Sequence, residues 1–449
     1  MDTRSDHSTR WLMLSIVFGS CLSTCLSPFV LTTILKDFHA GVFLMAFVPF
    51  SASLGGFFLF PIAFFFRDKN PKRQVIIFCM AQRFLMVVLP LSFLLSRIPP
   101  SAIPMIVVGI MALGSLITAG ATGHSQTWFG AIIPGDVLAT VLGTRTAIAL
   151  LVAALLTPLI GWFIRFVHTT GGDVRLFYGV LLSVAFAFGV TDILLLSRVR
   201  GGVAPKPSAS GRIGDSLRML LRDRRIREVC RISFLQLCGI FLAAPFFLLA
   251  YYACGFNEFA TGIIVTAGSL GAALGSVMGG FIADNVPVRR VLFAGMLSLT
   301  GLQFLFLLAL IVFARSSGSF TGFAVFLLLS FLYNLSIFVV ASAMTKLTYQ
   351  NVASEANVSF SFIQWITGVM TLLLMAASAK FGAFLAGRES AIRELFGPDA
   401  TYFHVLFALS VLAGVIAIFF LRRQTLQKGS DGNSEGNSPG SGGGFLLSR

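Results

Sequence analysis

Long apolar runs follow one another along this chain, and short polar segments separate them. Twelve runs reach the roughly 20 residues that a helix needs to cross a hydrocarbon core about 30 Å thick. The predicted spans lie near residues 11–35, 42–66, 74–95, 103–123, 147–167, 175–197, 232–253, 259–283, 291–313, 320–344, 361–386 and 403–421. The pattern therefore predicts an all-α membrane protein with twelve transmembrane helices.

The polar segments divide the chain into five parts. The predicted parts are an N-terminal tail (1–10), a six-span half (11–197), a linker (198–231), a second six-span half (232–421) and a disordered Gly/Ser/Asn-rich tail (422–449). The second part of the linker, from Asp215 to Arg231, has the periodicity of an amphipathic helix. A helix lying on an anionic membrane surface and a solvated basic linker both fit this segment.

Composition supports the membrane assignment and narrows the class of function. Of 449 residues, 56% are hydrophobic and 11% are charged, whereas soluble domains carry roughly 25% charged residues. The net charge of +15 comes from short loops between apolar spans, so the expected partner is the lipid bilayer and not nucleic acid. The six cysteines have neither a disulfide framework nor zinc spacing, and we expect no metal and no cofactor.

An enzyme is the main class that the sequence disfavours. The five histidines are scattered at the tails and at the ends of spans, and the chain has no H-E-x-x-H and no G-x-S-x-G motif. No acidic cluster is present at membrane depth. We therefore expect the chain not to be an enzyme.

The distribution of basic residues predicts the orientation of the spans. On the side of the termini the tails and loops hold 24 of the 33 Lys and Arg residues, and the opposite side holds 8. Cytoplasmic loops carry the excess of Lys and Arg. Both termini and the linker are therefore expected in the cytoplasm.

A repeat relates the two halves. Residues 53–78, "SLGGFFLFPIAFFFRDKNPKRQVIIF", align without a gap to residues 269–294, "SLGAALGSVMGGFIADNVPVRRVLFA", with 8 of 26 positions identical at an offset of 216. Each segment is the second span of its half plus the following loop. Parallel halves of this kind are typical of transporters that rock around a central site.

The repeated loop resembles a motif of the major facilitator superfamily, G-x-L-x-D-R-x-G-R-R/K. The matching positions are Gly280, Asp284, Arg289 and Arg290 in the second half and Asp68, Lys72 and Arg73 in the first. The resemblance implies two parallel six-helix halves and a secondary transporter of a small solute in the plasma (bacterial inner) membrane, working by alternating access. A non-transporting receptor or scaffold on the same fold is the alternative.

A narrower resemblance links the chain to a poorly characterised bacterial branch of the superfamily. Trp128, Gly130, Pro134 and Arg145 fit its pattern, but the branch brings no substrate.

The loop motif has a physical interpretation as a conformational switch. An aspartate at a helix end can cap the next helix and pair with arginines of a neighbouring element. Such a contact can hold in one conformer and release in another. Ordinary charge decoration of a cytoplasmic loop is the alternative.

Polar side chains in the apolar spans are candidates for the solute site. The resemblance implies that spans one, four, seven and ten line a central cavity, and the candidates there are Ser20, Thr24, Ser27, Thr118, Gln236, Tyr333 and Asn334. These uncharged groups suit a neutral, polyhydroxylated or zwitterionic solute, with a coupling ion left open. The hydroxyl groups can equally donate hydrogen bonds to backbone carbonyls of their own helix. Gly271, Gly275 and Gly279 have the spacing of close helix packing, and we expect that face of span eight to slide against the other half.

Two ionisable residues lie inside predicted spans. Arg83 lies about nine residues into span three, roughly 13 Å deep at 1.5 Å per residue, and Asp192 lies in span six. An unpaired guanidinium at that depth is expensive. The alternatives for its partner are Asp192, backbone carbonyls, a water-filled cavity or an anionic group of the solute. Arg83 is therefore expected either to anchor the structure or to take part in transport.

Overall fold

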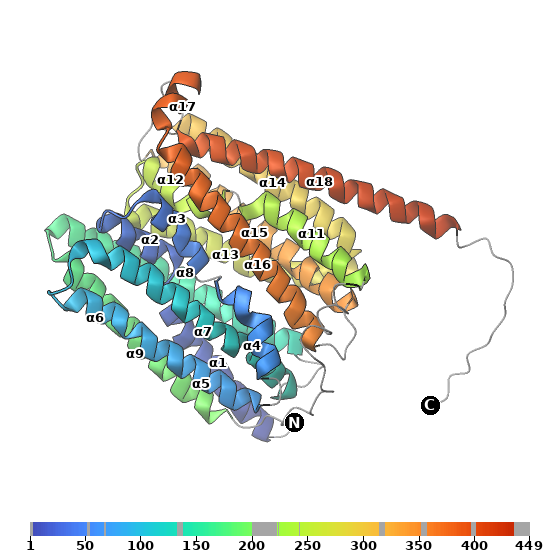
Figure 1. Cartoon of the computed structure of the whole chain (residues 1–449), viewed down its shortest axis with the longest axis horizontal. Coiled ribbons are helices and arrows are strands. Elements are labelled where there is room, and N and C mark those ends of the chain that lie inside the picture. The colour runs from blue at the N-terminus through green and yellow to red at the C-terminus, as the bar shows by residue number, and fades with distance from the viewer. Residues whose placement is uncertain are drawn as a thin grey trace.

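The structure is a computed structural model that describes residues 3–51, 54–66, 69–132, 138–199, 222, 224–241, 243–313, 319–351, 357–396 and 401–434. Throughout these residues the regular structure is helical, and no strand occurs among them. Figure 1 shows the helices of the first half, in blue and green, lying beside those of the second half, in yellow and red. The predicted all-α class and the two six-helix halves are confirmed.

The helices of the N-terminal half occupy residues 3–198. They are α1 (Thr3–Cys25), α2 (Pro28–Asp37), α3 (Val42–Ser51), η1 (Leu54–Phe58), α4 (Leu59–Phe65), α5 (Pro71–Met86), α6 (Val88–Leu94), η2 (Pro100–Ala102), α7 (Ile103–Ile132), α8 (Leu138–Thr170) and α9 (Val174–Arg198).

The helices of the C-terminal half occupy residues 224–434. They are α11 (Arg224–Phe241), η3 (Ala244–Phe246), α12 (Phe247–Ala253), α13 (Glu258–Asn285), α14 (Val288–Phe313), α15 (Phe320–Asn351), α16 (Asn357–Ala386), α17 (Glu389–Phe396) and α18 (Tyr402–Ser434).

Ten helical segments in the described residues are long and apolar enough to cross a membrane. The other two predicted spans are interrupted: residues 42–66 form α3, η1 and α4, and residues 232–253 form the end of α11, η3 and α12. Gly55 lies at the first interruption. A Cβ at this position would overlap the Ser115 carbonyl of α7, and the Gly55 N–H donates a hydrogen bond to Ser115 Oγ at 3.1 Å. The chain meets α7 there at backbone distance.

The first span of each half is broken at a proline. Ser27 caps the N-terminus of α2 directly before Pro28, and η3, which contains Pro245, separates α11 from α12. Proline has no N–H for the helical ladder, so it favours the start of a new helix over the interior of one. The two prolines are 217 positions apart (245 minus 28), within one residue of the repeat offset of 216. The repeat therefore extends to a matched pair of breaks.

Each half has its own apolar core. One large cluster of buried side chains, including Phe306, Phe326 and Phe407, lies almost wholly between residues 226 and 421. Two further clusters lie between residues 12 and 199 and include Phe29 and Tyr178. Each half is therefore packed largely around its own core, although Ala46 and Phe60 of the N-terminal half belong to the core of the other half.

The glycine face of α13 packs inside its own half, which corrects the expectation that it slides against the other half. A Cβ at Gly271 or Gly275 would overlap the backbone of α15 at Phe331 and Leu335, and one at Gly279 would lie 2.8 Å from Val339 Cα. Small residues permit backbone contact, and such intimate contact fixes two helices together. In the other half α13 contacts mainly α8, and also α2.

Several helices extend beyond their predicted spans, and two of them enter segments with another prediction. α11 begins at Arg224, inside the predicted linker, while residues 200–221 and 223 of that linker lie outside the described residues. α18 continues to Ser434, although the tail from residue 422 was predicted to be disordered. Residues 421–428, "LRRQTLQK", are mostly good helix formers, so the helix runs past the membrane span, and its last turns also include Gly429 and Gly432. Figure 1 shows its last turns projecting beyond the neighbouring helices.

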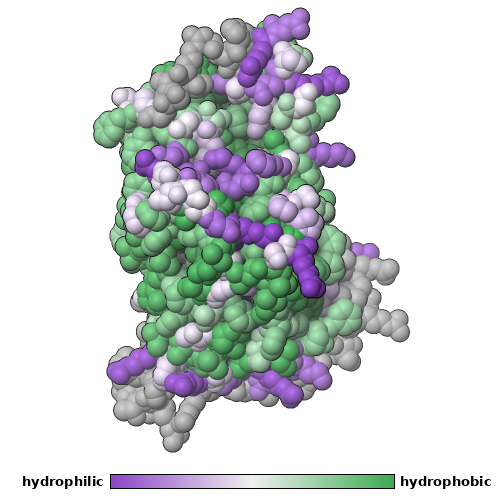
Figure 2. Space-filling model, turned by 90° about the vertical axis from the view of Figure 1, so that its left-hand side faces the viewer, coloured by the Kyte–Doolittle hydropathy of each residue, from purple (hydrophilic) through white to green (hydrophobic). Residues whose placement is uncertain are grey.

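The exterior is largely apolar, as lipid contact requires. Phe84, Phe281 and Phe320 are 70%, 72% and 83% exposed. Figure 2 shows broad hydrophobic areas on one face, with hydrophilic side chains gathered in a band and near the upper and lower edges. In a soluble protein such areas would mark a binding surface or an aggregation hazard, whereas here they suit the bilayer.

The two ends of the bundle are named by the course of the first span. We call the end where the first span starts, near residue 10, the terminal end. The far end is the one where that span finishes at Asp37, and it also holds the α8–α9 connection and the start of α13.

Candidate functional site

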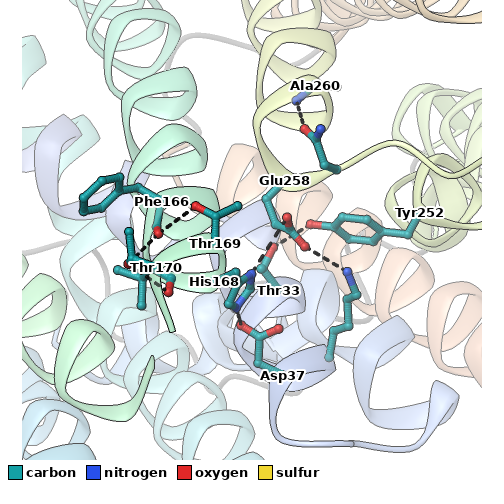
Figure 3. Close-up of polar contacts among 12 residues, drawn as sticks. Thr33, Asp37, Phe166, His168, Thr169, Thr170, Tyr252, Glu258 and Ala260 are labelled. Atoms are coloured by element: carbon teal, nitrogen blue, oxygen red, sulfur yellow. Dashed lines mark hydrogen bonds and ion pairs between the residues drawn. The ribbon is translucent and has the colours of Figure 1, made fainter. Parts of the chain in front are cut away.

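A polar cluster joins the two halves at the far end. We call it the interhalf cluster, and its members are Thr33, Lys36 and Asp37 of α2, His168 of α8, Tyr178 of α9, Tyr252 of α12 and Glu258 of α13. The first five residues belong to the N-terminal half and the last two to the C-terminal half. Most of its side chains are shown in Figure 3.

Four contacts in the cluster cross between the halves. Lys36 Nζ lies 3.0 Å from Glu258 Oε1 as a hydrogen-bonded ion pair. His168 Nδ1 lies 3.9 Å from Glu258 Oε2. Thr33 Oγ1 and the Tyr252 hydroxyl share a hydrogen bond of 2.7 Å, and the Lys36 ammonium lies 4.2 Å from the centre of the Tyr252 ring. One carboxylate and one phenol of the C-terminal half thus engage three side chains of the other half.

The N-terminal half supplies a second carboxylate that supports these contacts. Asp37 Oδ2 accepts a hydrogen bond from the Tyr178 hydroxyl at 2.6 Å and lies 3.1 Å from His168 Nε2. Tyr178 itself is fully buried. His168 therefore stands between two carboxylates, Asp37 on its own half and Glu258 on the other, as Figure 3 shows.

Local sequence signals position both carboxylates. Asp37 is the last residue of α2, and the chain leaves it through Phe38 and through His39, whose φ of 54° lies in the left-handed region. Asn257 caps α13 by accepting a hydrogen bond from the Ala260 N–H at 2.9 Å, which places Glu258 in the first helical turn. The helix dipole favours a negative charge there.

Two glycines allow the helices that carry His168 and Glu258 to meet. A Cβ at Gly161 of α8 would lie 2.8 Å from the Glu258 carbonyl oxygen, and one at Gly262 of α13 would lie 3.3 Å from the Thr157 carbonyl oxygen. Deeper in the bundle Thr266 of α13 donates a hydrogen bond to the Ala154 carbonyl at 3.3 Å. α8 and α13 are therefore the seam between the halves next to the cluster.

The charge balance of the cluster depends on one proton. Lys36 is positive and the two carboxylates are negative, so the cluster has an excess negative charge when His168 is neutral. A protonated His168 makes it neutral and adds attraction between the halves, because the imidazolium faces a carboxylate on each side. The contacts that Lys36 and His168 make with Glu258 across the halves are thus between ionisable groups.

Two of the repeated loop residues, Lys72 and Arg289, contact their own half. Lys72 Nζ donates hydrogen bonds to the Ser197 and Val199 carbonyls at 3.0 and 2.7 Å, and Arg289 pairs with Glu228. Arg73 and Arg290 are exposed, Gly280 faces open space, Asp68 lies outside the described residues, and so does the side chain of Asp284. The switch role of these loops stays a prediction.

The predicted intramembrane charges form a pair. Arg83 Nη2 lies 3.3 Å from Asp192 Oδ2, with the two side chains 12% and 11% exposed. Arg83 also donates to the Gly189 carbonyl at 3.5 Å and to Gln82 Oε1. The partner is thus Asp192, the first of the alternatives drawn from the sequence, together with a backbone carbonyl. Whether the pair anchors the fold or serves transport stays a prediction.

The predicted cavity residues do not form one group. Thr24 and Thr118 donate hydrogen bonds to carbonyls one turn back, and Asn334 donates to the Ser330 carbonyl at 2.9 Å. Ser27 caps α2. The polar groups of these four side chains are therefore hydrogen-bonded to the backbone of their own or the adjoining helix. Tyr333 is buried and accepts a hydrogen bond of 3.4 Å from Gln303. Gln236 is half-buried, and Ser20 is buried with a hydroxyl that has no partner in the described residues.

The interhalf cluster is what sequence reasoning missed. From the sequence, Lys36 counted only among the basic residues of the loops. His168 counted only among the histidines at the ends of spans. Their signal was weak but present: in a chain with 11% charged residues, the ends of the first, fifth and eighth spans carry Lys36, Asp37, His168 and Glu258. Only the packing of the halves brings these ends together.

No protein-family model and no curated protein sequence matches the chain. Solved structures do match. A D-xylose-proton symporter aligns with a TM-score of 0.70 at 13% identity, covering 92% of this chain and 96% of the symporter. A mutant of the nucleoside transporter NupG aligns with a TM-score of 0.68 at 12% identity, covering 93% of this chain and 99% of the transporter. The chain has the major facilitator fold.

A third match agrees with this fold. The inward-facing structure of a bacterial homologue of the iron transporter ferroportin aligns with a TM-score of 0.65 at 15% identity, covering 94% of this chain and 99% of the homologue. Coverage on both sides is nearly complete, so the major facilitator fold accounts for the whole bundle. The two interrupted spans are therefore crossings of the same twelve-helix fold.

Proposed function

We propose that the chain is a secondary transporter that moves a small solute by alternating access between its two halves. The observation that carries the proposal is the interhalf cluster, in which charged side chains of the two halves meet at one end of the bundle. A contact of this kind can form and break as the halves rock. Separate apolar cores in the halves support the same motion.

The matched proline breaks support a solute site between the first span of each half. Helices interrupted at corresponding places in two repeats are the usual pointer to the binding site of a transporter, because their free backbone groups need partners. Here the breaks lie at Pro28 and Pro245. The candidates nearest to them in sequence are Thr24, Ser27 and Gln236.

The orientation proposed from the sequence places the interhalf cluster on the outer face. Both termini lie in the cytoplasm of a plasma (bacterial inner) membrane, and the cluster closes the opposite end of the pathway. At the terminal end the described charged groups that the loops supply, Lys72 and Arg289, make contacts within their own halves. This arrangement supports assigning the conformer as closed outside, with Asp68 and Asp284 acting in the opposite conformer.

The solved relatives indicate the kind of solute to test first. Two of them are named as a nucleoside transporter and a D-xylose-proton symporter, which handle small polar molecules. We infer a small polar solute for this chain, with a proton or another ion as the coupling partner to be determined.

Flux in proteoliposomes tests the proposal. The purified chain is reconstituted, and labelled pentoses, nucleosides, amino acids and dicarboxylates are assayed with and without a pH gradient. We expect saturable uptake of at least one class, slowed by Asp284→Asn without loss of expression. Protein that folds and inserts but moves none of these solutes would favour the non-transporting receptor or scaffold.

A further inference from the structure

A second polar cluster lies buried within the N-terminal half. Its members come from three helices: Arg83 from α5, Arg145 from α8 and Asp192 from α9. Asp192 pairs with Arg83 at 3.3 Å and also interacts electrostatically with Arg145. One carboxylate thus serves two arginines.

The charges of this cluster do not balance. Both guanidinium groups are permanently charged, so two positive charges face a single negative one. Arg145 interacts electrostatically with Asp192 and with the thiol of Cys79, which is neutral in its ordinary state. Among the described residues the cluster therefore has one more positive than negative charge, and a buried charge is expensive without a counter-charge.

Arg145 is also short of hydrogen-bond partners. Its Nε atom is buried and has no acceptor in the described part of the chain, while the guanidinium lies 4.6 Å above the ring of Phe129. Arg83, by contrast, donates to Gln82, Gly189 and Asp192. A buried donor on a charged group without an acceptor carries the full cost of its desolvation. The unused donor and the excess charge belong to the same residue.

One of the three helices that carry the cluster, α8, lies at the seam between the halves. Asp192 packs against α1, where a Cβ at Gly19 would lie 3.2 Å from Asp192 Oδ2. α1 begins the span that is broken at Pro28, and α8, which carries Arg145, contacts α13 of the other half. A group bound at Arg145 would thus lie on a helix that takes part in the motion between the halves.

We propose that Arg145, with Arg83 beside it, binds a carboxylate or phosphate group of the transported solute. The inference rests on the proposed transport function and names its substrate class, a small organic or inorganic anion. An anion would restore neutrality in the cluster and accept the hydrogen bond that Nε now lacks. Arginine suits this task because its planar fork of donors matches the oxygens of carboxylates and phosphates.

Anion binding to the purified chain tests the site without requiring transport. The chain is placed in nanodiscs of phosphatidylcholine, so that no anionic lipid headgroup competes, and thermal unfolding is followed while succinate or inorganic phosphate is added at constant ionic strength. We expect a saturable rise in Tm with at least one of the two anions and none with a neutral sugar. A rise that appears only when an anionic lipid is present would assign the site to lipid and overturn the proposal.

Substitutions of Arg145 locate the effect. Loss of a charge-assisted donor pair at Arg145→Gln should weaken binding roughly 10- to 100-fold. Arg145→Lys keeps the charge but lacks the planar fork of donors, so its affinity for the anion should lie between those of the wild type and Arg145→Gln. The control is Arg393→Gln, which removes an arginine whose exposed side chain pairs with Glu389 at 2.9 Å, and it should bind like the wild type. Should Arg145→Gln fail to fold, Arg145→Lys and the wild-type titration still decide.

Two results would overturn the proposal. The first is the absence of saturable stabilisation by either anion in the wild type, and the second is equal affinity in Arg145→Gln and wild type. Counterflow of the anion that binds separates this inference from the transport function. Flux of a neutral solute without anion binding would refute the anion site and leave transport intact. Anion binding without flux of any solute would refute the transport function and the substrate assignment together.

Discussion

Neutralising Glu258 should open the far end of the bundle. Its carboxylate is the group of the C-terminal half that engages both Lys36, at 3.0 Å, and His168, at 3.9 Å. Glu258→Gln keeps the shape of the side chain and its place in the first turn of α13, but removes the charge. The closed conformer loses these attractions, whereas the open conformer, in which the groups are apart and hydrated, loses little.

The size of the effect follows from how exposed the partners are. The Glu258 side chain is 11% exposed and that of Lys36 is 41% exposed, so the pair lies between a surface ion pair and a buried one. Surface pairs contribute at most about 1 kcal/mol and breaking buried ones costs about 3–5 kcal/mol, so about 1–2 kcal/mol is reasonable here. That energy changes the ratio of closed to open conformers roughly 5- to 30-fold. A closed fraction of about 90% would fall to roughly 25–65%.

Distances between spin labels at the far end measure this ratio. Cysteines for labelling are placed at Thr169 of α8 and Phe320 of α15, which are exposed and belong to different halves, in a background without native cysteines. The wild type should give mainly one short distance, and Glu258→Gln should add a population at longer distance. The matched control is Glu389→Gln, because Glu389 pairs with Arg393 within the C-terminal half.

The reasoning fails if Glu258→Gln and wild type give the same distance distribution. It also fails if Glu389→Gln opens the far end as much as Glu258→Gln does, because the effect would then come from charge in general.

Three further predictions concern the interhalf cluster, the Arg83–Asp192 pair and the orientation of the chain. His168→Ala removes a ring that lies 3.1 Å from Asp37 of its own half and 3.9 Å from Glu258 of the other half, so it should lower the closed fraction in the spin-label assay, and an unchanged distance distribution would contradict this. Asp192→Asn leaves Arg83 and Arg145 without their carboxylate and should destabilise the protein by about 3–5 kcal/mol, seen as a lower Tm in detergent, while an unchanged Tm would show that the pair does not anchor the fold. An impermeant thiol reagent added outside should label a single cysteine at position 317 and not one at Ser208, and the opposite pattern would reverse the proposed orientation.

Local sequence patterns were sufficient for the architecture. Twenty apolar residues in a row predict a span whatever surrounds them, because the bilayer sets the required length. The gapless alignment of residues 53–78 with 269–294 predicted two parallel halves, and the solved structures agree with it. The Arg83–Asp192 pair was among the expected alternatives, since a buried charge must find a partner.

Tertiary structure alone decided which ends and faces meet. Lys36 and Glu258 are 222 residues apart, and neither lies in a motif. Gly271 has the spacing of a contact face, but the spacing does not say whether α8 or α15 will cover it, and the packing chose α15. Arg145 fitted the pattern of the bacterial branch that the sequence resembles. Only the packing of α5, α8 and α9 placed it near Asp192, the carboxylate that pairs with Arg83. The length of an apolar run predicts a span because it depends only on residues next to one another in the chain. Pairing between helices depends on the shape and charge of side chains hundreds of residues away.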